Sequence, residues 1–441
     1  MRRSNDKIVD NETLFQSLYP QYLDILEDLA RRYDCVEAQS YENLVNFQTN
    51  LTSPKHGWYD YKQGYSEMLV KIIIDECKPS VDSFILDPFC GVGTTNLVAQ
   101  SLGFKSIGTD INPMAILAAK VKTHFYTTDE IELIDSQITN FKLPSKKDVI
   151  NGGRVILTSF TKDVLNTLLQ IKYFIEHIDN IYVQMFFRLA FISIIDVCSQ
   201  KVKDGNGLKF KKNYRPVENV VDVFLNKSKR MLSDIHISNH NIECNCILGS
   251  MLDPKIAEEV KKNPIELCVF SPPYANCFDY CEVYKLELWL GGYVKSYSDF
   301  KIYRDMALRS HVNSKFSHEF SEIIPEVDII ASLVSTFNLW NKNIPDMLRG
   351  YFDDMKILLK NVFHVLSKNS KCYIVVANSA YKGILVPTDL ILAYIAESLG
   401  YKCEKIHIAR KIRSSSQQMK ELYEEYDNLM RESIVELSKT S

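Results

Sequence analysis

The apolar positions near the start of the chain repeat with a helical period. Over residues 13–50 they recur at steps of three and four residues, which predicts a helical segment with one apolar face. The positions that form this face are Leu14, Leu18, Tyr22, Ile25, Leu26, Leu29 and Tyr33. Such a face either docks a partner or packs on the main domain, and we favour packing on the main domain.

A different pattern follows between residues 84 and 120. Phe84–Leu86 is a short apolar run typical of a buried strand, and a glycine-containing loop comes directly after it. Asn96–Leu102 returns to the helical period, Ser106–Asp110 predicts a second strand that ends in an acid, and Pro113 opens another helix. Strand, glycine loop, helix and acid-ended strand indicate the beginning of a doubly wound α/β sheet.

This rhythm is then interrupted and later resumes. Between about 120 and 240 the pattern is largely helical and includes an apolar helix near 182–200. Strands are predicted at 245–250, 267–270, 371–377 and 403–409, and helices at 350–367 and 389–399. Beyond them the acidic tail is predicted to be helical, with the charges from Glu421 to Glu436 on a solvated helix face.

Composition narrows the class of protein without deciding the function. The 441 residues are 46% hydrophobic and 24% charged, which is ordinary for a globular protein. The net charge is only −3, so any surface for nucleic acid must come from local clusters of Lys and Arg. The eleven cysteines include no C-x-x-C pair, so we expect no metal site and reduced thiols that are buried or half-buried. No run reaches the ~18–20 apolar residues of a membrane span, and we expect a cytoplasmic protein.

The first candidate for chemistry is the loop DPFCGVGTT at 87–95. A glycine-rich turn after a strand lets the backbone approach a ligand, and the next helix offers unpaired N–H groups. Asp110, which ends the next strand, suits an acid that accepts hydrogen bonds from ribose hydroxyls. Gly91 and Gly93 are followed by Asn96 where a dinucleotide fingerprint has its third glycine. The pattern therefore disfavours NAD and favours another adenosine-containing cofactor that lacks a pyrophosphate.

The second candidate is SPPY at 271–274, directly after the strand predicted at 267–270. Two successive prolines cannot continue a sheet, and they stiffen the chain as it leaves the strand. Such a turn places a hydroxyl and a carbonyl at the carboxyl edge of the sheet, where folds of this type bind ligands. Tyr274 then offers a flat ring on which a nucleic-acid base can stack.

DPFCGVGTT, GTDINP and SPPY, in this order, resemble the motifs of the DNA amino-methyltransferases. The resemblance implies a class I S-adenosylmethionine-dependent methyltransferase fold, which is a Rossmann-like doubly wound α/β sheet, here with a largely helical insertion. It also implies that the glycine loop wraps the methionine part of S-adenosylmethionine, that Asp110 holds the ribose, and that the tetrapeptide holds a flipped-out base. An aromatic segment ahead of the first strand matches a further cofactor contact, and Ser250 takes the position of the adenine partner, where this chain lacks an Asp. The implied cofactor residues are Asp87, Pro88, Phe89, Gly91, Gly93, Thr94, Thr95, Asp110, Ile111, Ser250 and Tyr61, and the implied catalytic residues are Ser271, Pro272, Pro273 and Tyr274.

The first residue of the tetrapeptide bears on the target base. Within the family, Ser at this position is typical of enzymes that methylate the N4 amine of cytosine, so Ser271 favours that reaction. Methylation of adenine N6 is the alternative, because it shares every other element. An RNA methyltransferase is disfavoured, since those enzymes more often carry Asp or Asn before Pro-Pro-Tyr. A catalytically silent relic that binds DNA or a partner is the alternative outside the enzymes, and the retention of all three motifs disfavours it.

Contacts with double-stranded DNA must come from elsewhere in the chain. A basic loop at 201–215, with Phe210 and Tyr214 between its cations, is the first candidate, although a solvated surface loop has the same composition. A stretch after the tetrapeptide is the second candidate, and Arg410, Lys411 and Arg413 form a smaller third cluster. The candidate DNA contacts of the first two are Lys209, Lys211, Lys212, Arg215, Lys301, Arg304 and Arg309.

The resulting expectation divides the chain into three parts. Residues 1–55 form an N-terminal helical segment, and 121–240 form a helical insertion that is the candidate DNA-recognition region. Residues 56–120 and 241–441 form the catalytic domain, with a variable region at about 276–345. The family resemblance further implies a restriction-modification or related defence system, in which a cognate restriction endonuclease would act separately, but the sequence does not reveal whether such a nuclease exists. It does not predict an oligomeric state.

Overall fold

The computed structural model describes residues 11–61, 64–150, 152–205, 207–236, 242–313, 320–412 and 429–440. The chain divides into two compact units. Unit 1 comprises residues 1–42, 272–278 and 308–441, and unit 2 comprises residues 43–271 and 279–307. Each unit therefore contains segments that are distant from one another in the sequence.

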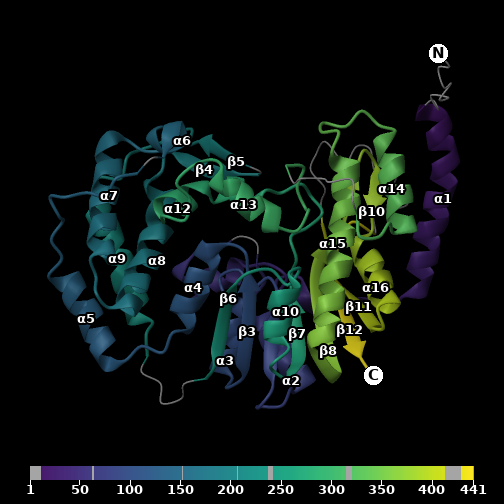
Figure 1. The fold of residues 1–441 in the computed structure, drawn as a ribbon, viewed down its shortest axis with the longest axis horizontal. Helices are drawn as coiled ribbons and strands as arrows, with labels where there is room; N and C mark the ends of the chain where they lie inside the picture. Colours follow the sequence, from purple (N-terminus) through teal and green to yellow (C-terminus); the bar gives the residue numbers. More distant parts are fainter. Residues whose placement is uncertain are drawn as a thin grey trace. The chain divides into compact units, whose positions relative to one another are not determined.

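Four parallel strands form the sheet of unit 2, in the order β7-β2-β3-β6 (Figure 1). Their bounds are β2 (Phe84–Asp87), β3 (Lys105–Asp110), β6 (Cys244–Leu248) and β7 (Ile265–Phe270). The helices α2 (Glu67–Cys77), α3 (Thr94–Ser101) and α4 (Pro113–Thr123) pack on these strands, and α10 (Pro254–Val260) connects β6 to β7. Asn112 caps α4 by accepting from the Met114 N–H, and Pro113 opens the helix as predicted. The doubly wound beginning predicted from the sequence is thus confirmed.

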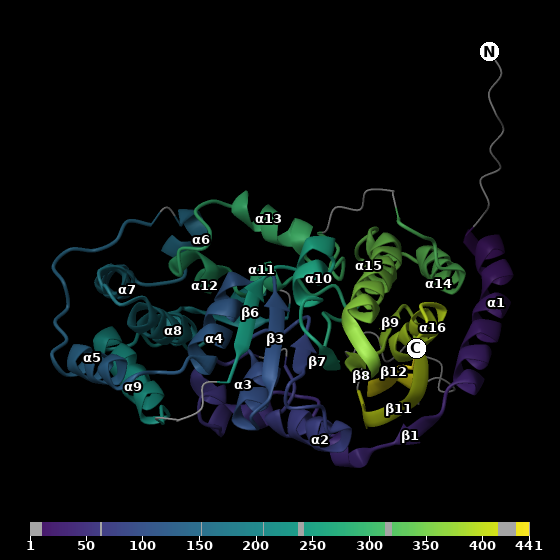
Figure 2. The ribbon, with the colours of Figure 1, turned by 60° about the horizontal axis from the view of Figure 1, so that its bottom comes forward.

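The connection from β3 to β6 carries a group of helices. These are α5 (Thr128–Thr139), α6 (Gly153–Leu157), α7 (Lys162–Glu176), α8 (Ile181–Cys198) and α9 (Val220–Ser233). Of these, α5, α7, α8 and α9 pack against one another (Figure 2). A capping box between Thr127 and Glu130 starts α5, which explains why this polar segment begins a helix where it does.

Helix α8 corrects the expectation that no segment is long and apolar enough to cross a membrane. Its 18 residues meet that criterion by length and composition, with a mean hydropathy of 1.7. In unit 2, however, 56% of this window is buried within the protein, and the helix packs against α4, α7 and α9. Its apolar side chains therefore serve as the core of the helical group.

The basic segment 201–215, predicted as a loop, contains an antiparallel hairpin. Its strands are β4 (Lys201–Asp204) and β5 (Gly207–Phe210), paired from Lys201 with Phe210 to Asp204 with Gly207. Alternation of side chains between the two faces lets Lys203 turn inward while its neighbours stay outside, and a strand cannot be recognised from so short a charged run. The last elements of unit 2 are the 3₁₀ turns η2 (Gln48–Thr52) and η3 (His56–Trp58) and the helices α11 (Tyr280–Val283), α12 (Lys285–Leu290) and α13 (Asp299–Met306).

The strands of unit 1 lie in the order β1-β11-β12-β8. Their bounds are β1 (Cys35–Glu37), β8 (Leu366–Ala377), β11 (Lys402–Lys411) and β12 (Arg431–Lys439), with a small hairpin of β9 (Ser379–Tyr381) and β10 (Ile384–Val386). The helices are α1 (Asn11–Arg32), α14 (Pro325–Ser335), α15 (Ile344–Val365) and α16 (Thr388–Ser398), with a 3₁₀ turn η1 (Gln39–Tyr41). Helix α16 packs on the strands, and α1 packs on α14 and α16 (Figure 2). The apolar face of α1 is therefore packed within its own unit, as favoured above, but the helix ends at Arg32 and the chain continues into β1.

The acidic tail is the largest departure from the predicted secondary structure. Residues 413–428, including Arg413, lie outside the described residues, but 431–439 form β12, antiparallel to both β8 and β11. The charges that suggested a solvated helix are paired across the strands instead. Glu436 accepts from Lys371 and His407, and Arg431 pairs with Asp389 of α16. Partners distant in sequence offset the desolvation of these charges, so a charged segment occupies the interior of a sheet.

All eleven cysteines are free thiols that are buried or half-buried, as expected.

Candidate active site

The glycine loop of unit 2 runs from the end of β2 to the start of α3. Gly91 and Gly93 both adopt positive φ angles, +49° and +80°, which side-chain-bearing residues rarely take. A Cβ on Gly91 would lie 3.0 Å from Cε1 of Tyr61, and a Cβ on Gly93 would lie 2.8 Å from Cβ of Ala119 in α4. Gly93 is thus required by the packing of the loop on α4, while Gly91 keeps space open beneath Tyr61.

Asp110, at the end of β3, binds the backbone of the glycine loop through its carboxylate. Its Oδ2 accepts from the Gly91 N–H at 2.9 Å, and its Oδ1 accepts from the Asn112 N–H at 2.8 Å. Burial raises the pKa of the Asp110 carboxyl to about 6. The hydrogen bonds from these N–H groups act in the opposite direction and lower it. The group is therefore mostly ionised at neutral pH.

Asp87, at the end of β2, accepts hydrogen bonds from three groups of unit 2. Its carboxylate accepts from the Tyr65 hydroxyl at 2.8 Å, the Thr95 hydroxyl at 2.7 Å and the Phe89 N–H at 3.0 Å. Burial raises the pKa of Asp87 to about 6, while these hydrogen bonds act in the opposite direction. Asp87 and Thr95 therefore brace the loop from inside.

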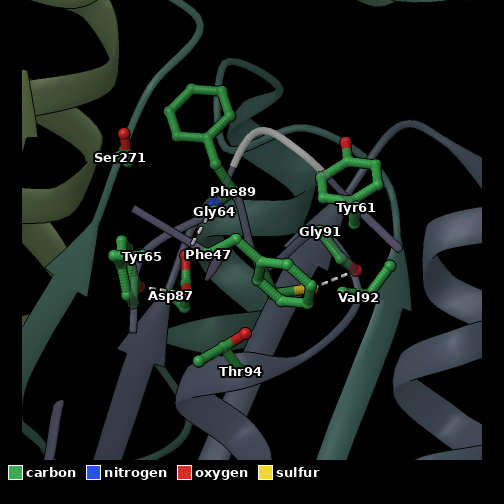
Figure 3. Close-up of a pocket in the computed structure, with 11 residues that line it drawn as sticks. Phe47, Tyr61, Gly64, Tyr65, Asp87, Phe89, Gly91, Val92, Thr94 and Ser271 are labelled. Atoms are coloured by element: carbon green, nitrogen blue, oxygen red, sulfur yellow. Dashed lines mark hydrogen bonds between the residues drawn. The ribbon is translucent and has the colours of Figure 1, made fainter. Parts of the chain in front are cut away.

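A small cavity opens beside the loop (Figure 3). It lies where β2 and β7 meet, which is the point at which the strand order of this sheet reverses and where doubly wound folds bind ligands. Figure 3 shows Tyr61 on one side of the loop and Ser271, which follows β7, on the other. The cavity is lined by Phe47, Tyr61, Gly64, Tyr65, Asp87, Phe89, Cys90, Gly91, Val92, Thr94 and Ser271.

Tyr61 is held in place by a buried aromatic stack. Its ring lies on that of Tyr284 with centroids 5.2 Å apart and an interplanar angle of 16°. Behind the stack, the ammonium of Lys203 lies 4.2 Å from the Tyr284 ring centroid and pairs with Glu287 and Asp196. One wall of the cavity is thus rigid before any ligand binds.

The tetrapeptide at 271–274 crosses the division of the chain, since Ser271 belongs to unit 2 and Pro272–Phe278 to unit 1. In unit 1 the Tyr274 hydroxyl donates to Glu432 at 2.6 Å, and the Tyr381 hydroxyl donates to the Ala275 carbonyl at 2.6 Å. The Cys277 N–H donates to the Ser310 carbonyl at 3.1 Å. The segment after Ser271 is therefore fastened along its length.

Comparison with known proteins bears on this arrangement. Residues 17–121 match the family model described as "DNA methylase" of the N6/N4 type. The chain is 26% identical to the type II methyltransferase M.BsoBI of Geobacillus stearothermophilus, over 85% of this chain and 84% of that protein. It is 27% identical to the type II methyltransferase M.AvaI of Nostoc sp., over 85% of each chain. A solved structure, the rRNA methyltransferase aviRa of Streptomyces viridochromogenes, is 10% identical over 85% of each chain with a TM-score of 0.28.

These matches support assignment of the chain to the DNA amino-methyltransferases, the family that its motifs resemble. Its fold is that of a class I S-adenosylmethionine-dependent methyltransferase, as predicted, and its methyl donor is S-adenosylmethionine. The cavity fits this cofactor on two counts: aromatic faces that suit a sulfonium cation, and backbone without a Cβ at Gly91. The ionised Asp110 lies outside the cavity lining and holds the Gly91 N–H. S-adenosylmethionine supplies an electrophilic methyl group, and the groups that would hold it belong to the loop and to Asp110.

The structure brings together some of the residues predicted to bind the cofactor and leaves others apart. Asp87, Phe89, Gly91, Thr94 and Tyr61 line the cavity together with Ser271. The remaining predicted residues do not line it: Pro88, Gly93, Thr95, Asp110, Ile111 and Ser250. Of these, Ser250 follows β6, and its hydroxyl accepts from the Leu252 N–H at 3.2 Å.

Sequence reasoning did not single out Phe47, Gly64, Cys90 and Val92 as lining residues of the methyltransferase's cavity, and it included Tyr65 only as part of the aromatic segment. Phe47 was assigned to the helical segment at 13–50, and only its position in space relates it to the loop. Tyr65 lies in the aromatic segment ahead of β2, which was a usable signal. Trp58 of the same segment instead donates its indole N–H to Asp234 at 2.8 Å.

Some of the candidate DNA contacts are exposed cations, and others are paired with carboxylates or carbonyls of the protein. Lys209, Lys212, Arg215 and Lys301 are exposed, although Lys209 pairs with Asp204 at the surface. Lys211 donates to the Asp196 carbonyl at 2.9 Å. Arg304 pairs with Asp279 and Glu282, Arg309 with Asp353 and Asp354, and Arg410 with Glu432, each inside its own unit. These three arginines are tied to protein carboxylates, which disfavours a role on phosphates.

Proposed function

We propose that this methyltransferase transfers the methyl group of S-adenosylmethionine to the N4 amine of a cytosine flipped out of double-stranded DNA. The observation that carries the proposal is that Ser271 lines the same cavity as Gly91 and the rest of the glycine loop. Within this family, a serine at that position favours cytosine N4. The two relatives named as type II methyltransferases further support a place in a restriction-modification system. The proposal includes a separately acting endonuclease and cytoplasmic DNA as the substrate.

The chemistry follows from the residue types of the tetrapeptide. An exocyclic amine is a poor nucleophile, because its lone pair is delocalised into the ring. If the Ser271 hydroxyl and the Pro272 carbonyl accept its two N–H bonds, the nitrogen becomes pyramidal and its lone pair is free to attack. The amine needs no strong base at the outset, since the proton can leave after transfer. Positioning alone can then supply roughly 7–11 kcal/mol of the barrier reduction.

Leaving the helix costs the base a few kcal/mol of stacking and pairing. Tyr274 follows two prolines whose own backbone angles are fixed, and its ring offers a stacking surface that returns about 1–3 kcal/mol. The tetrapeptide thus combines hydrogen-bond acceptors for the amine with an aromatic face for the ring.

Product analysis tests the proposal directly. The protein is incubated with S-adenosylmethionine labelled in the methyl group and unmodified DNA of mixed sequence, and the DNA is digested to nucleosides. We expect the label in N4-methylcytosine. Label found solely in N6-methyladenine would contradict the target but keep the reaction class, and the absence of labelled nucleosides would contradict the enzyme.

The basic hairpin β4–β5 and the residues after it should contribute contacts with phosphates. Lys209 and Lys212 are exposed, and the surface pair of Lys209 with Asp204 is weak enough to exchange for a phosphate. Replacing both by Ala should weaken DNA binding and reduce the slope of log affinity against log salt by about two. Fluorescence anisotropy with a labelled duplex over a salt series measures the slope.

A matched control removes two exposed lysines elsewhere in unit 2, Lys255 and Lys262 near α10. This control variant loses the same charge as the hairpin variant. A difference between their salt slopes therefore depends on where the lysines lie. If the salt slope of the hairpin variant equals that of the control, the hairpin makes no phosphate contacts and is only a solvated surface.

A further inference from the structure

The Tyr274 side chain is bound to a buried carboxylate of β12. Its hydroxyl donates to Oε1 of Glu432 at 2.6 Å. The other oxygen of this carboxylate, Oε2, accepts from Nε and Nη2 of Arg410, each at 2.7 Å. The two oxygens are thus divided between the tyrosine and the guanidinium.

The register of the sheet in unit 1 places this carboxylate. Glu432 lies opposite Ala377 of β8 on one side and opposite Arg410 of β11 on the other. Directly opposed residues of antiparallel strands point to the same face, so Arg410 meets Glu432 across the ladder. A slip of one residue in β12 would turn Glu432 to the opposite face of the sheet and separate it from Tyr274.

Burial makes this pairing necessary. Glu432 is 4% exposed, and a carboxylate taken out of water is costly unless its charge is paired and its lone pairs are occupied. Arg410 provides the charge and Tyr274 provides the second donor. Arg410 holds Oε2 with two donors while Tyr274 donates to Oε1, so each carboxylate oxygen is restrained by a different side chain.

A fixed acceptor has a consequence for the ring that carries the hydroxyl. The prolines restrict the backbone before Tyr274, and the hydrogen bond at the far end of the side chain restricts its two torsion angles. A ring restrained at both ends loses little further entropy when a base stacks on it. Such restraint is what a site requires to hold a reacting group in a productive orientation.

We propose that Glu432, oriented by Arg410, is a positioning residue that holds the Tyr274 ring in the orientation that receives the target base. This inference rests on the proposed role of the tetrapeptide. It assigns a function in base recognition to the last strand of the chain, which lies more than 150 residues beyond the tetrapeptide.

A double-mutant cycle tests the proposal in the full chain. Tyr274→Phe keeps the ring and removes the hydroxyl, leaving the Glu432–Arg410 pair intact. Glu432→Gln keeps the shape of the side chain but replaces one acceptor oxygen by an N–H₂ group. That group then faces either the Tyr274 hydroxyl or the Arg410 guanidinium, which are both donors. Each should lower the single-turnover rate of methyl transfer to unmodified plasmid DNA by about 10- to 100-fold, the range for a lost hydrogen bond to a charged group. The double variant should be no slower than the slower single variant, because both changes remove the same restraint.

Glu436→Gln is the matched control. Glu436 lies on the same strand and face as Glu432, and it accepts from Lys371, Tyr373 and His407 without contacting Tyr274. These donors hold the pKa of Glu436 at about 2, so its loss should lower the melting temperature as the loss of Glu432 does. The transfer rate of Glu436→Gln should stay near that of the wild type, and affinity for S-adenosylmethionine should be unchanged in all variants.

Two outcomes would overturn the inference: a wild-type rate in Tyr274→Phe, or rate losses that multiply in the double variant. The Tyr274→Phe result decides the matter even where Glu432→Gln fails to fold. Tyr274→Ala separates this inference from the proposed function. If Tyr274→Ala is slow while Tyr274→Phe is normal, only the restraint is refuted, whereas full activity in Tyr274→Ala would refute the role of the tetrapeptide itself.

Discussion

Gly91→Val should weaken binding of S-adenosylmethionine by about 100-fold or more, equivalent to roughly 3 kcal/mol. Two effects add at this position. The φ of +49° is strained for a β-branched residue, and a Cβ would lie 3.0 Å from the Tyr61 ring. Tyr61 cannot withdraw easily, since it is stacked on Tyr284. The new side chain would therefore occupy the cavity, and calorimetric titration of the purified protein measures the loss.

Gly103 offers a control for the backbone strain alone. It also has a positive φ, +84°, but a Cβ there would meet nothing within 4 Å. Gly103→Val should lower the melting temperature through strain and leave the affinity for S-adenosylmethionine near that of the wild type. Equal affinities for wild type and Gly91→Val would remove the glycine loop from the cofactor site.

Tyr274→Ala should cut methyl transfer sharply while leaving S-adenosylmethionine binding nearly intact. Loss of base stacking is worth about 1–3 kcal/mol, and the variant also removes the Tyr274 donor from Oε1 of the buried Glu432 carboxylate. Ser271→Ala should reduce transfer for a different reason, since it removes one acceptor for the target amine. Single-turnover kinetics with labelled S-adenosylmethionine separate transfer from binding.

Ser271→Asp extends the same experiment to the target base. An aspartate adds charge and a second acceptor, so this variant should keep some activity and shift the product toward N6-methyladenine. Undiminished transfer in both Tyr274→Ala and Ser271→Ala would place the reaction elsewhere in the protein. The affinity for S-adenosylmethionine serves as the internal control, because neither substitution alters the glycine loop.

Short-range patterns in the sequence were enough to predict the glycine loop, the acid-ended strand β3 and the turn after β7. Each depends on residues close together in the chain. Gly91 and Gly93 take backbone angles that other residues avoid, two prolines end a strand, and short apolar runs make buried parallel strands. The sequence also predicted that the turn at Ser271 lies at the carboxyl edge of the sheet, and the structure places Ser271 in the cavity with Asp87 and Gly91.

Only the tertiary structure decided which charged residues are free and which distant residues complete the site. The charges of β12 suggested a solvated helix, yet Glu432 and Glu436 are paired by cations on strands β8 and β11. The sequence suggested Arg304 and Arg309 as DNA contacts, but the structure pairs each of them with a carboxylate of the protein. The physical reason is common to these cases: burial of a charge depends on a partner whose position is set by strand register and chain crossover, and neither is encoded in local spacing.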